Sequence, residues 1–146
     1  MQEIPRNGPI SLNKLACCVI LFLPIPLQYG NGVFNIKALP KEVQFSCVCG
    51  ILCEDVNNDG NIDLVMAGNN FEFKPQFSRL DSNFGSILLN NGDLEFEWQD
   101  YKESGFFIKG EVKHLLQFKD NDGRAYIIAA INNEKPKIFY FGFNTI

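Results

Sequence analysis

The sequence lacks the residue patterns that indicate catalysis or nucleic-acid binding. It has a single histidine, His114, which lies in a strand-like run, and its 13 Lys and Arg residues are scattered among 17 Asp and Glu residues, for a formal net charge of -4. A phosphate-binding surface needs clustered positive charge, so no nucleic-acid partner is expected. The sequence also has no G-x-S-x-G elbow and no glycine-rich phosphate loop, and we expect no enzymatic activity.

Apolar runs long enough to cross a bilayer are also lacking. The longest run, Leu15 to Leu27, is much shorter than the roughly 20 residues that a spanning helix needs. Its length is typical of a secretory signal, but Pro24 and Pro26 interrupt it and no clear cleavage site follows. Residues 1–27 are therefore a signal-like leader, a buried strand or a non-native extension. We expect the folded domain to cover residues 28–146.

The cysteines do not complete a metal site. There are five, and three of them (Cys47, Cys49 and Cys53) fall in one apolar run. A closed zinc site needs four ligands, and no fourth cysteine or histidine lies near these three in the sequence. We expect these thiols to behave as small apolar side chains of a buried strand.

What the sequence does contain is a succession of short strand-like segments. Fourteen phenylalanines and many β-branched runs favour strands over helices. The runs recur about every 8 to 12 residues and are separated by turns rich in Asn, Asp and Gly, as in sandwiches, barrels and propellers. The pattern predicts an all-β protein with strands at 33–38, 45–53, 64–67, 86–89, 94–98, 112–118, 125–131 and 138–143.

An internal repeat distinguishes among these architectures. At an offset of 63 positions, Asn58-Asp59-Gly60-Asn61 aligns with Asn121-Asp122-Gly123-Arg124, and the apolar segment 64–67 aligns with 127–130. A period of this size, with several strands in each unit, predicts the blades of a β-propeller, about two of them in this chain. The long unpatterned segment 70–85 is then an insertion, which is a common place for binding residues.

The loop from Asp55 to Asp63 has the composition of a calcium site. Gly60 at its sixth position permits a sharp turn, Asn61 at the seventh offers a main-chain carbonyl, and side-chain oxygens occupy positions 1, 3, 5 and 9: Asp55, Asn57, Asp59 and Asp63. Calcium takes six to eight oxygen ligands. An EF-hand would also need Glu at position 12, where this chain has Met66. The alternative is a turn without metal, since these residues are common in turns, but the alternating spacing favours Ca²⁺.

The sequence DVNNDGNIDL followed by VMAGN resembles the FG-GAP/VCBS repeat, whose loop reads D-x-[DN]-x-D-G-x-x-D-[LIV]. Residues 41–92 also resemble the C-terminal blades of bacterial ASPIC/UnbV-type VCBS proteins, and the resemblance extends over about residues 30–141. In that family a Pro-Gln…Arg-x-Asp…Gly segment follows the calcium strand, and it is matched here by Pro75, Gln76, Arg79, Asp81 and Gly85.

The resemblance implies a calcium-stabilised propeller module located outside the cell, on its surface or in the periplasm. Such a module would bind an extracellular protein or a glycan, or mediate adhesion. The second unit departs from the loop pattern, since Phe118 and Tyr126 occupy positions 1 and 9, so Asp120 and Asp122 are expected to be turn residues only. Propellers take 4 to 8 blades, so the remaining blades are expected outside this chain. The alternative is a carbohydrate-binding domain, or an accessory domain of a carbohydrate-active enzyme, whose 70–85 aromatics stack on sugar.

Overall fold

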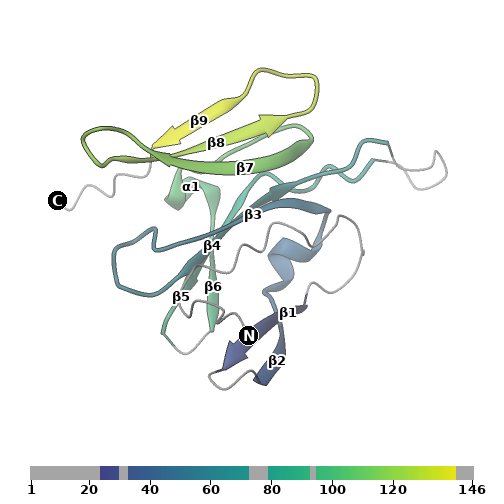
Figure 1. The fold of residues 1–146 in the computed structure, drawn as a ribbon. Helices are drawn as coiled ribbons and strands as arrows, with labels where there is room; N and C mark the ends of the chain where they lie inside the picture. Colours follow the sequence, from purple (N-terminus) through teal and green to yellow (C-terminus); the bar gives the residue numbers. More distant parts are fainter. Residues whose placement is uncertain (1–23, 30–32, 73–78, 93–94, 141–146) are drawn as a thin grey trace, which may run out of the picture.

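The computed structural model describes residues 24–29, 33–72, 79–92 and 95–140 (Figure 1). Within these ranges the chain is mostly antiparallel β-sheet, which confirms the all-β prediction. The first sheet has two strands, β1 (Pro24–Tyr29) and β2 (Val33–Ala38). The second has four, β3 (Val48–Glu54), β4 (Asp63–Gly68), β5 (Ser86–Asn90) and β6 (Phe96–Gln99). The third has three, β7 (Val112–Lys119), β8 (Ala125–Ile131) and β9 (Lys137–Tyr140).

Two short helices connect the sheets. The 3-10 helix η1 (Lys41–Gln44) precedes β3, and the α-helix α1 (Tyr101–Ser104) precedes β7. The side chain of Asp100 caps α1 by accepting the main-chain N–H of Lys102, and Gly105 ends it with a left-handed φ of 68°. Such caps satisfy main-chain groups that a helix end leaves without partners. Among the described residues, no helix is both long and apolar enough to cross a membrane.

Most predicted strands appear close to their expected bounds, but two boundaries differ. The strand predicted at 45–53 begins only at Val48, because Pro40 starts η1 and leaves the side chain of Phe45 61% exposed at its end. The other is at the start of the domain, expected at residue 28: β1 pairs with β2 from Pro24 onward, inside residues 1–27, for which a leader, a buried strand and a non-native extension were the alternatives. Residues 1–23, and the predicted end of the last strand at 141–143, lie outside the described residues.

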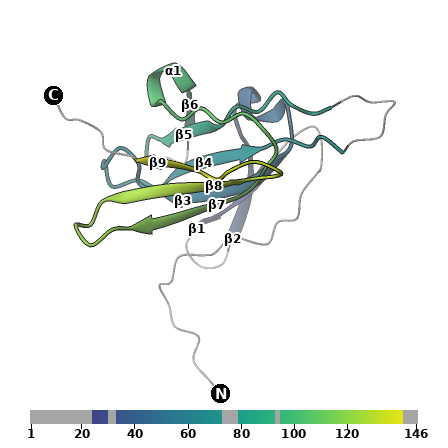
Figure 2. The same cartoon turned by 90° about the horizontal axis from the view of Figure 1, so that it is seen from above.

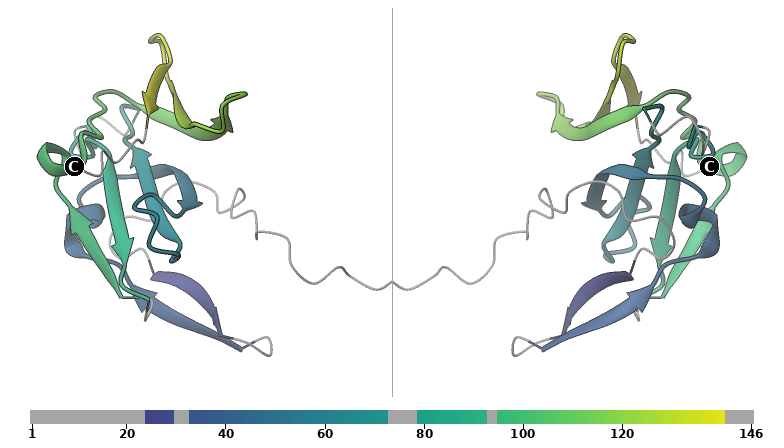
Figure 3. Two further views of the ribbon diagram at one scale, coloured as in Figure 1. Left: turned by 90° about the vertical axis from the view of Figure 1, so that its left-hand side faces the viewer. Right: turned by 90° about the vertical axis from the view of Figure 1, so that its right-hand side faces the viewer.

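The four-stranded sheet lies between the other two sheets (Figures 1 and 3). Each of its strands pairs with its sequence neighbour, so it is a simple up-and-down meander. All six residues of β4 are buried. On one face Val65 and Ala67 pack toward β7–β9, and on the other Leu64 and Met66 pack toward η1. This burial on both faces explains why β4 is apolar after its first residue, Asp63.

The contact between the second and third sheets is close. Seen from above, β7 lies next to β3 and β4 (Figure 2). A Cβ atom on Gly50 would lie 2.8 Å from Leu115 Cγ and 3.0 Å from the Leu115 main-chain nitrogen. The apolar cluster between the sheets includes Val65, Ile87, Leu115 and Ile127. Glycine is therefore needed at position 50 to let the two sheets approach.

The sequence repeat corresponds to a structural repeat. The β3–β4 ladder has a bulge between Val48 and Gly50, and the β7–β8 ladder has one between Val112 and His114, at the same place in the hairpin. After β4, the main-chain N–H of Asn69 donates to the carbonyl of Cys47 at 3.0 Å. After β8, the N–H of Asn132 donates to the carbonyl of Glu111 at 2.9 Å. The two hairpins thus share register, bulge and closing hydrogen bond.

The three described cysteines lie in three different settings. Cys47 is buried, Cys49 is half-buried and Cys53 is exposed. Cys47 precedes β3, and the bulge interrupts the strand between Val48 and Gly50. The expectation that all three occupy one buried strand is therefore wrong for Cys53, because β3 is only partly buried.

Candidate calcium loop

The loop predicted to bind calcium joins two strands of the central sheet. It begins after β3 ends at Glu54 and finishes at Asp63, the first residue of β4. The flanking elements are strands, which agrees with the rejection of an EF-hand. Two residues of the loop adopt left-handed backbone conformations, Asn58 with φ 60° and Gly60 with φ 89°. These two positions turn the chain tightly enough to bring nearby side chains together.

Three of the predicted ligands share one hydrogen-bonded turn. The Asp55 carboxylate accepts the main-chain N–H groups of Asp59 at 3.1 Å and of Gly60 at 2.9 Å. Asn57 Oδ1 accepts the same Asp59 N–H at 3.0 Å, and Asp59 Oδ1 accepts the Asn61 N–H at 2.7 Å. The side chains of Asp55, Asn57 and Asp59 therefore all fold back over the main chain of the loop.

Asp59 occupies the centre of this turn. Its Oδ2 accepts a hydrogen bond from Asn57 Nδ2 at 2.9 Å. The main-chain hydrogen bond from Asn61, followed by that from the Asn57 side chain, holds the pKa of Asp59 below its usual range. The carboxylate is therefore ionised at neutral pH, as a calcium ligand must be.

Asp63 is placed differently from the other predicted ligands. Its carboxylate is fully buried; Oδ2 accepts the Val56 N–H at 2.9 Å and Oδ1 accepts the Asn90 N–H at 2.8 Å. Asn90 in turn donates from Nδ2 to the carbonyl of Ile62 at 3.1 Å. Asp63 thus closes the base of the loop and joins it to the turn between β5 and β6. Asn90, which directly follows the strand predicted at 86–89, was not predicted to be part of this site.

The donor types in the loop fit a hard cation. Carboxylate, amide and main-chain carbonyl oxygens are the ligands that calcium prefers. Among the described residues, however, no three acidic, histidine or cysteine side chains converge tightly enough to form a metal-binding group. The structure brings Asp55, Asn57 and Asp59 together and keeps Asp63 on main-chain amides, so the complete ligand set stays a prediction.

The equivalent loop of the second unit is a turn. Asp120 Oδ1 accepts the main-chain N–H groups of Asp122 at 2.9 Å and Arg124 at 2.8 Å. Its Oδ2 accepts the hydroxyl of Tyr126 at 3.1 Å. Tyr126 is the repeat equivalent of Asp63, and its hydroxyl donates a hydrogen bond to the Asp120 carboxylate of the turn. The prediction that Asp120 serves the turn is confirmed.

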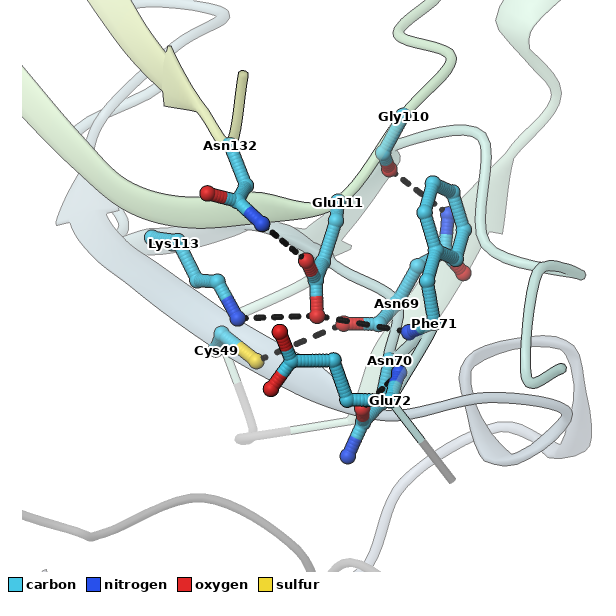
Figure 4. A network of polar contacts seen from close by, with 9 residues as sticks. All are labelled: Cys49, Asn69, Asn70, Phe71, Glu72, Gly110, Glu111, Lys113 and Asn132. Atoms are coloured by element: carbon cyan, nitrogen blue, oxygen red, sulfur yellow. Dashed lines mark hydrogen bonds and ion pairs between the residues drawn. The ribbon is translucent and has the colours of Figure 1, made fainter. Parts of the chain in front are cut away.

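A buried polar network connects the two repeat units near the other end of these hairpins (Figure 4). The Glu111 side chain is 1% exposed and accepts hydrogen bonds from Lys113 Nζ at 2.8 Å, Asn132 Nδ2 at 2.7 Å and the Phe71 main-chain N–H at 3.3 Å. Burial alone would raise the pKa of Glu111, but the bonds from Lys113, Asn132 and Phe71 outweigh it and hold the pKa below its usual range. Asn69 Nδ2 adds a bond to the carbonyl of Gly110 at 2.9 Å.

The described residues line two open clefts, one beside the 55–63 loop and one near the Glu111 network. One, of about 380 Å³, lies between the calcium loop and the β7–β8 turn, and its lining includes Asp55, Lys119 and Arg124. The other, of about 400 Å³, is lined in part by Phe71 and Phe84 together with charged side chains. Arg79 and Asp81, two residues of the matched family segment, line this second cleft, and the Arg79 guanidinium lies 3.9 Å from the centre of the Phe71 ring.

Compared with known proteins, the chain matches no protein-family model, no curated protein and no solved structure.

Proposed function

We propose that this chain is a calcium-stabilised part of a β-propeller that acts outside the cell as a ligand-binding or adhesion module. The observation that carries the proposal is the strand–loop–strand unit at Asp55–Asp63. Its side-chain oxygens fold into one turn, and its final Asp is fixed to the neighbouring strand. No catalysis is proposed.

The arrangement of the sheets supports a propeller. Propeller blades are four-stranded antiparallel sheets repeated around an axis, each packed against the next. On this interpretation β3–β6 is one blade, β7–β9 supplies the first three strands of the next, and β1–β2 supplies the last two of the previous blade. The shared bulges of the β3–β4 and β7–β8 hairpins agree with such a repeat. The remaining blades would come from outside this chain.

The proposed ion would be held by the side chains of Asp55, Asn57, Asp59 and Asp63 and by the carbonyl of Asn61. A calcium ion would supply positive charge to three carboxylates placed within nine residues. Calcium sites of extracellular modules often have dissociation constants of about 10⁻⁴ to 10⁻³ M. A site of this strength would be filled outside the cell or in the periplasm, where we place the protein.

Isothermal titration of the calcium-free protein with Ca²⁺ tests the site directly. We expect one ion per chain and no comparable heat with Mg²⁺, which keeps its waters and prefers a compact octahedron. The matched control is Asp122→Asn, the repeat equivalent of Asp59, which is 73% exposed at its side chain and should leave the titration unchanged. Equal loss of binding in Asp59→Asn and Asp122→Asn would contradict the assignment.

The second candidate function is carbohydrate binding, which the aromatic cleft favours. Phe84 is 40% exposed and stacks on Phe107 with ring centres 5.7 Å apart, beside Arg79 and Asp81. Exposed aromatic faces next to polar groups suit a sugar ring. A glycan array on the wild type and Phe84→Ala tests this function, with Phe45→Ala as a control on another exposed phenylalanine. Glycan binding that Phe84→Ala abolishes and Phe45→Ala retains would establish it.

A further inference from the structure

The aromatic cleft, of about 400 Å³, is built from separate segments of the chain that one buried amide holds together. Asn69 is 2% exposed, and its Nδ2 donates to the carbonyl of Asn83 at 2.7 Å and, as Figure 4 shows, to that of Gly110 at 2.9 Å. Its Oδ1 accepts the Asn83 main-chain N–H at 2.9 Å. These bonds fix the segments that carry the lining side chains. The volume lies in the range of about 300 to 1,000 Å³ that is typical of ligand sites.

The two cations of the cleft lie against aromatic rings. The Arg79 guanidinium lies 3.9 Å from the centre of the Phe71 ring, and Lys109 Nζ lies 5.6 Å from the centre of the Phe107 ring. The negative face of an aromatic ring attracts a cation in this position. Phe71 is itself fixed, because its main-chain N–H donates to the buried Glu111 carboxylate at 3.3 Å. The ring contact occupies one face of the Arg79 guanidinium and leaves the N–H donors in its plane for a ligand.

The two acids of the cleft are not paired with these cations. Asp81 and Glu134 also line it, yet in the described part of the chain neither carboxylate forms an ion pair with Arg79 or Lys109. With two cations and two acids, the charged side chains of the lining have a formal net charge of zero. The cleft therefore presents groups that donate hydrogen bonds beside groups that accept them, without a net attraction for charge of either sign.

An exposed ring forms the apolar part of the cleft. Phe84 is 40% exposed and lines the cleft, whereas Phe107 stacks on it from outside the lining, with ring centres 5.7 Å apart and ring planes at 22°. The Ile108 main-chain N–H also donates to the Phe84 carbonyl at 2.8 Å. The Phe84 ring is therefore held in place with part of its surface open to a ligand. A pyranose matches this arrangement, because its C–H face is apolar and each of its hydroxyl groups both donates and accepts hydrogen bonds.

We propose that the aromatic cleft binds one neutral pyranose unit of a glycan, with the sugar ring on Phe84 and its hydroxyl groups bonded to Arg79 and Asp81. This inference rests on the second candidate function, carbohydrate binding, and narrows it to a class of sugar. A uronate or an amino sugar would meet two like charges as well as two opposite charges in the lining. No net attraction would then offset the cost of taking the charge of the sugar out of water. Neutral hydroxyl groups carry no such cost.

Ligand-detected NMR titration of the 146-residue chain tests the proposed class with sugars that differ in charge. The probes are the methyl pyranosides of glucose, galactose and mannose, the corresponding uronates, methyl glucosaminide, and the amino acid phenylalanine as a zwitterion. We expect at least one neutral pyranoside to bind, and to bind at least about tenfold more tightly than its uronate. Phe84→Ala should weaken this binding at least about tenfold. Phe45→Ala, which changes a ring that is 61% exposed elsewhere, should leave it unchanged.

The variant Asp81→Asn tests the charge argument. It leaves two cations against one acid in the lining, so it should weaken binding of the neutral pyranoside and reduce or reverse the preference over the uronate. The matched control is Asp122→Asn, which changes the charge of the chain equally but lines the other cleft. Its preference should be that of the wild type. Circular dichroism of each variant establishes that it is folded before its binding is interpreted.

The possible failures are distinguishable. A wild type that binds the uronate as tightly as the neutral pyranoside, with loss in Phe84→Ala, would overturn this inference and leave carbohydrate binding in place. Binding of phenylalanine alone, or of no sugar, would overturn both. Equal preferences in Asp81→Asn and Asp122→Asn would show that the charges of the cleft do not select the sugar, and would also overturn the inference. None of these measurements involves Ca²⁺, so the proposed calcium site is tested independently.

Discussion

Asp63 Oδ1 accepts the main-chain N–H of Asn90 at 2.8 Å, which fastens the first residue of β4 to the last residue of β5. The other oxygen of the same carboxylate accepts the Val56 N–H at 2.9 Å. The carboxylate is fully buried, so both amides depend on it for their hydrogen bonds. Asp63 therefore has a structural role that does not require a metal.

Because Asp63 has this structural role and Asp59 does not, we predict that substitutions of the two residues have different effects on the free energy of unfolding in the absence of calcium. In EDTA, Asp63→Ala should lower the free energy of unfolding by about 2 to 3 kcal/mol, because it leaves two buried N–H groups without an acceptor. Asp59→Ala should lower it much less than Asp63→Ala does, because Asp59 is exposed. Urea denaturation measures both values. Equal losses in EDTA would show that Asp63 has no separate structural role.

The Glu111 network predicts a dependence of stability on pH. Because the pKa of Glu111 is lower in the folded state than its ordinary value of 4.5, its stabilisation is present above that value and is lost as pH falls through the folded-state pKa. Glu111→Gln should reduce stability by about 1 to 3 kcal/mol at neutral pH, and it should flatten the loss of stability as the pH falls below 4.5. Urea titrations across this range test it, with the exposed Glu97→Gln as control. An unchanged pH profile in Glu111→Gln would contradict the prediction.

The close approach of the two sheets predicts that a larger residue at position 50 destabilises the fold. Gly50→Ala should destabilise the fold by about 1 to 3 kcal/mol, because its methyl group would press on Leu115 from β7. In Gly50→Ala/Leu115→Ala the combined loss should be somewhat smaller than the sum of the single losses, since truncation of Leu115 removes the 2.8 Å contact with its Cγ while the 3.0 Å contact with its main-chain nitrogen remains. Thermal or urea unfolding of the three variants measures this coupling. Additive losses would mean that the two residues do not compete for space.

The sequence predicted the parts of this fold that depend on local pattern. Strand positions, turns and the second-unit turn at Asp120 follow from alternation and from Asn, Asp and Gly chemistry, and the structure agrees with them. The start of β3 was predicted too early. Phe45 is apolar and therefore indicates a strand, but it lies at the end of η1 and its side chain is exposed. The buried role of Asp63 was missed because its partner Asn90 is distant in the sequence.

The polar network around Glu111 could not be predicted for a related reason. Glu111, Phe71 and Asn132 come from three separate segments, and only the packing of the two repeat units brings them together. From the sequence alone, a single glutamate before a strand, such as Glu111, is expected at the surface.

The most direct test of the central claim is the melting temperature of the wild type, Asp59→Asn and Asp122→Asn in EDTA, in millimolar Ca²⁺ and in millimolar Mg²⁺. Binding to the folded state alone stabilises it by mass action, by about 0.4 to 1.4 kcal/mol at about 1 mM Ca²⁺ for a dissociation constant of about 10⁻³ to 10⁻⁴ M. The calcium hypothesis predicts that Ca²⁺ raises the melting temperature of the wild type and of Asp122→Asn, that Asp59→Asn responds little, and that Mg²⁺ has a small effect. A wild-type melting temperature that Ca²⁺ leaves unchanged, or an equal rise in Asp59→Asn, would contradict it.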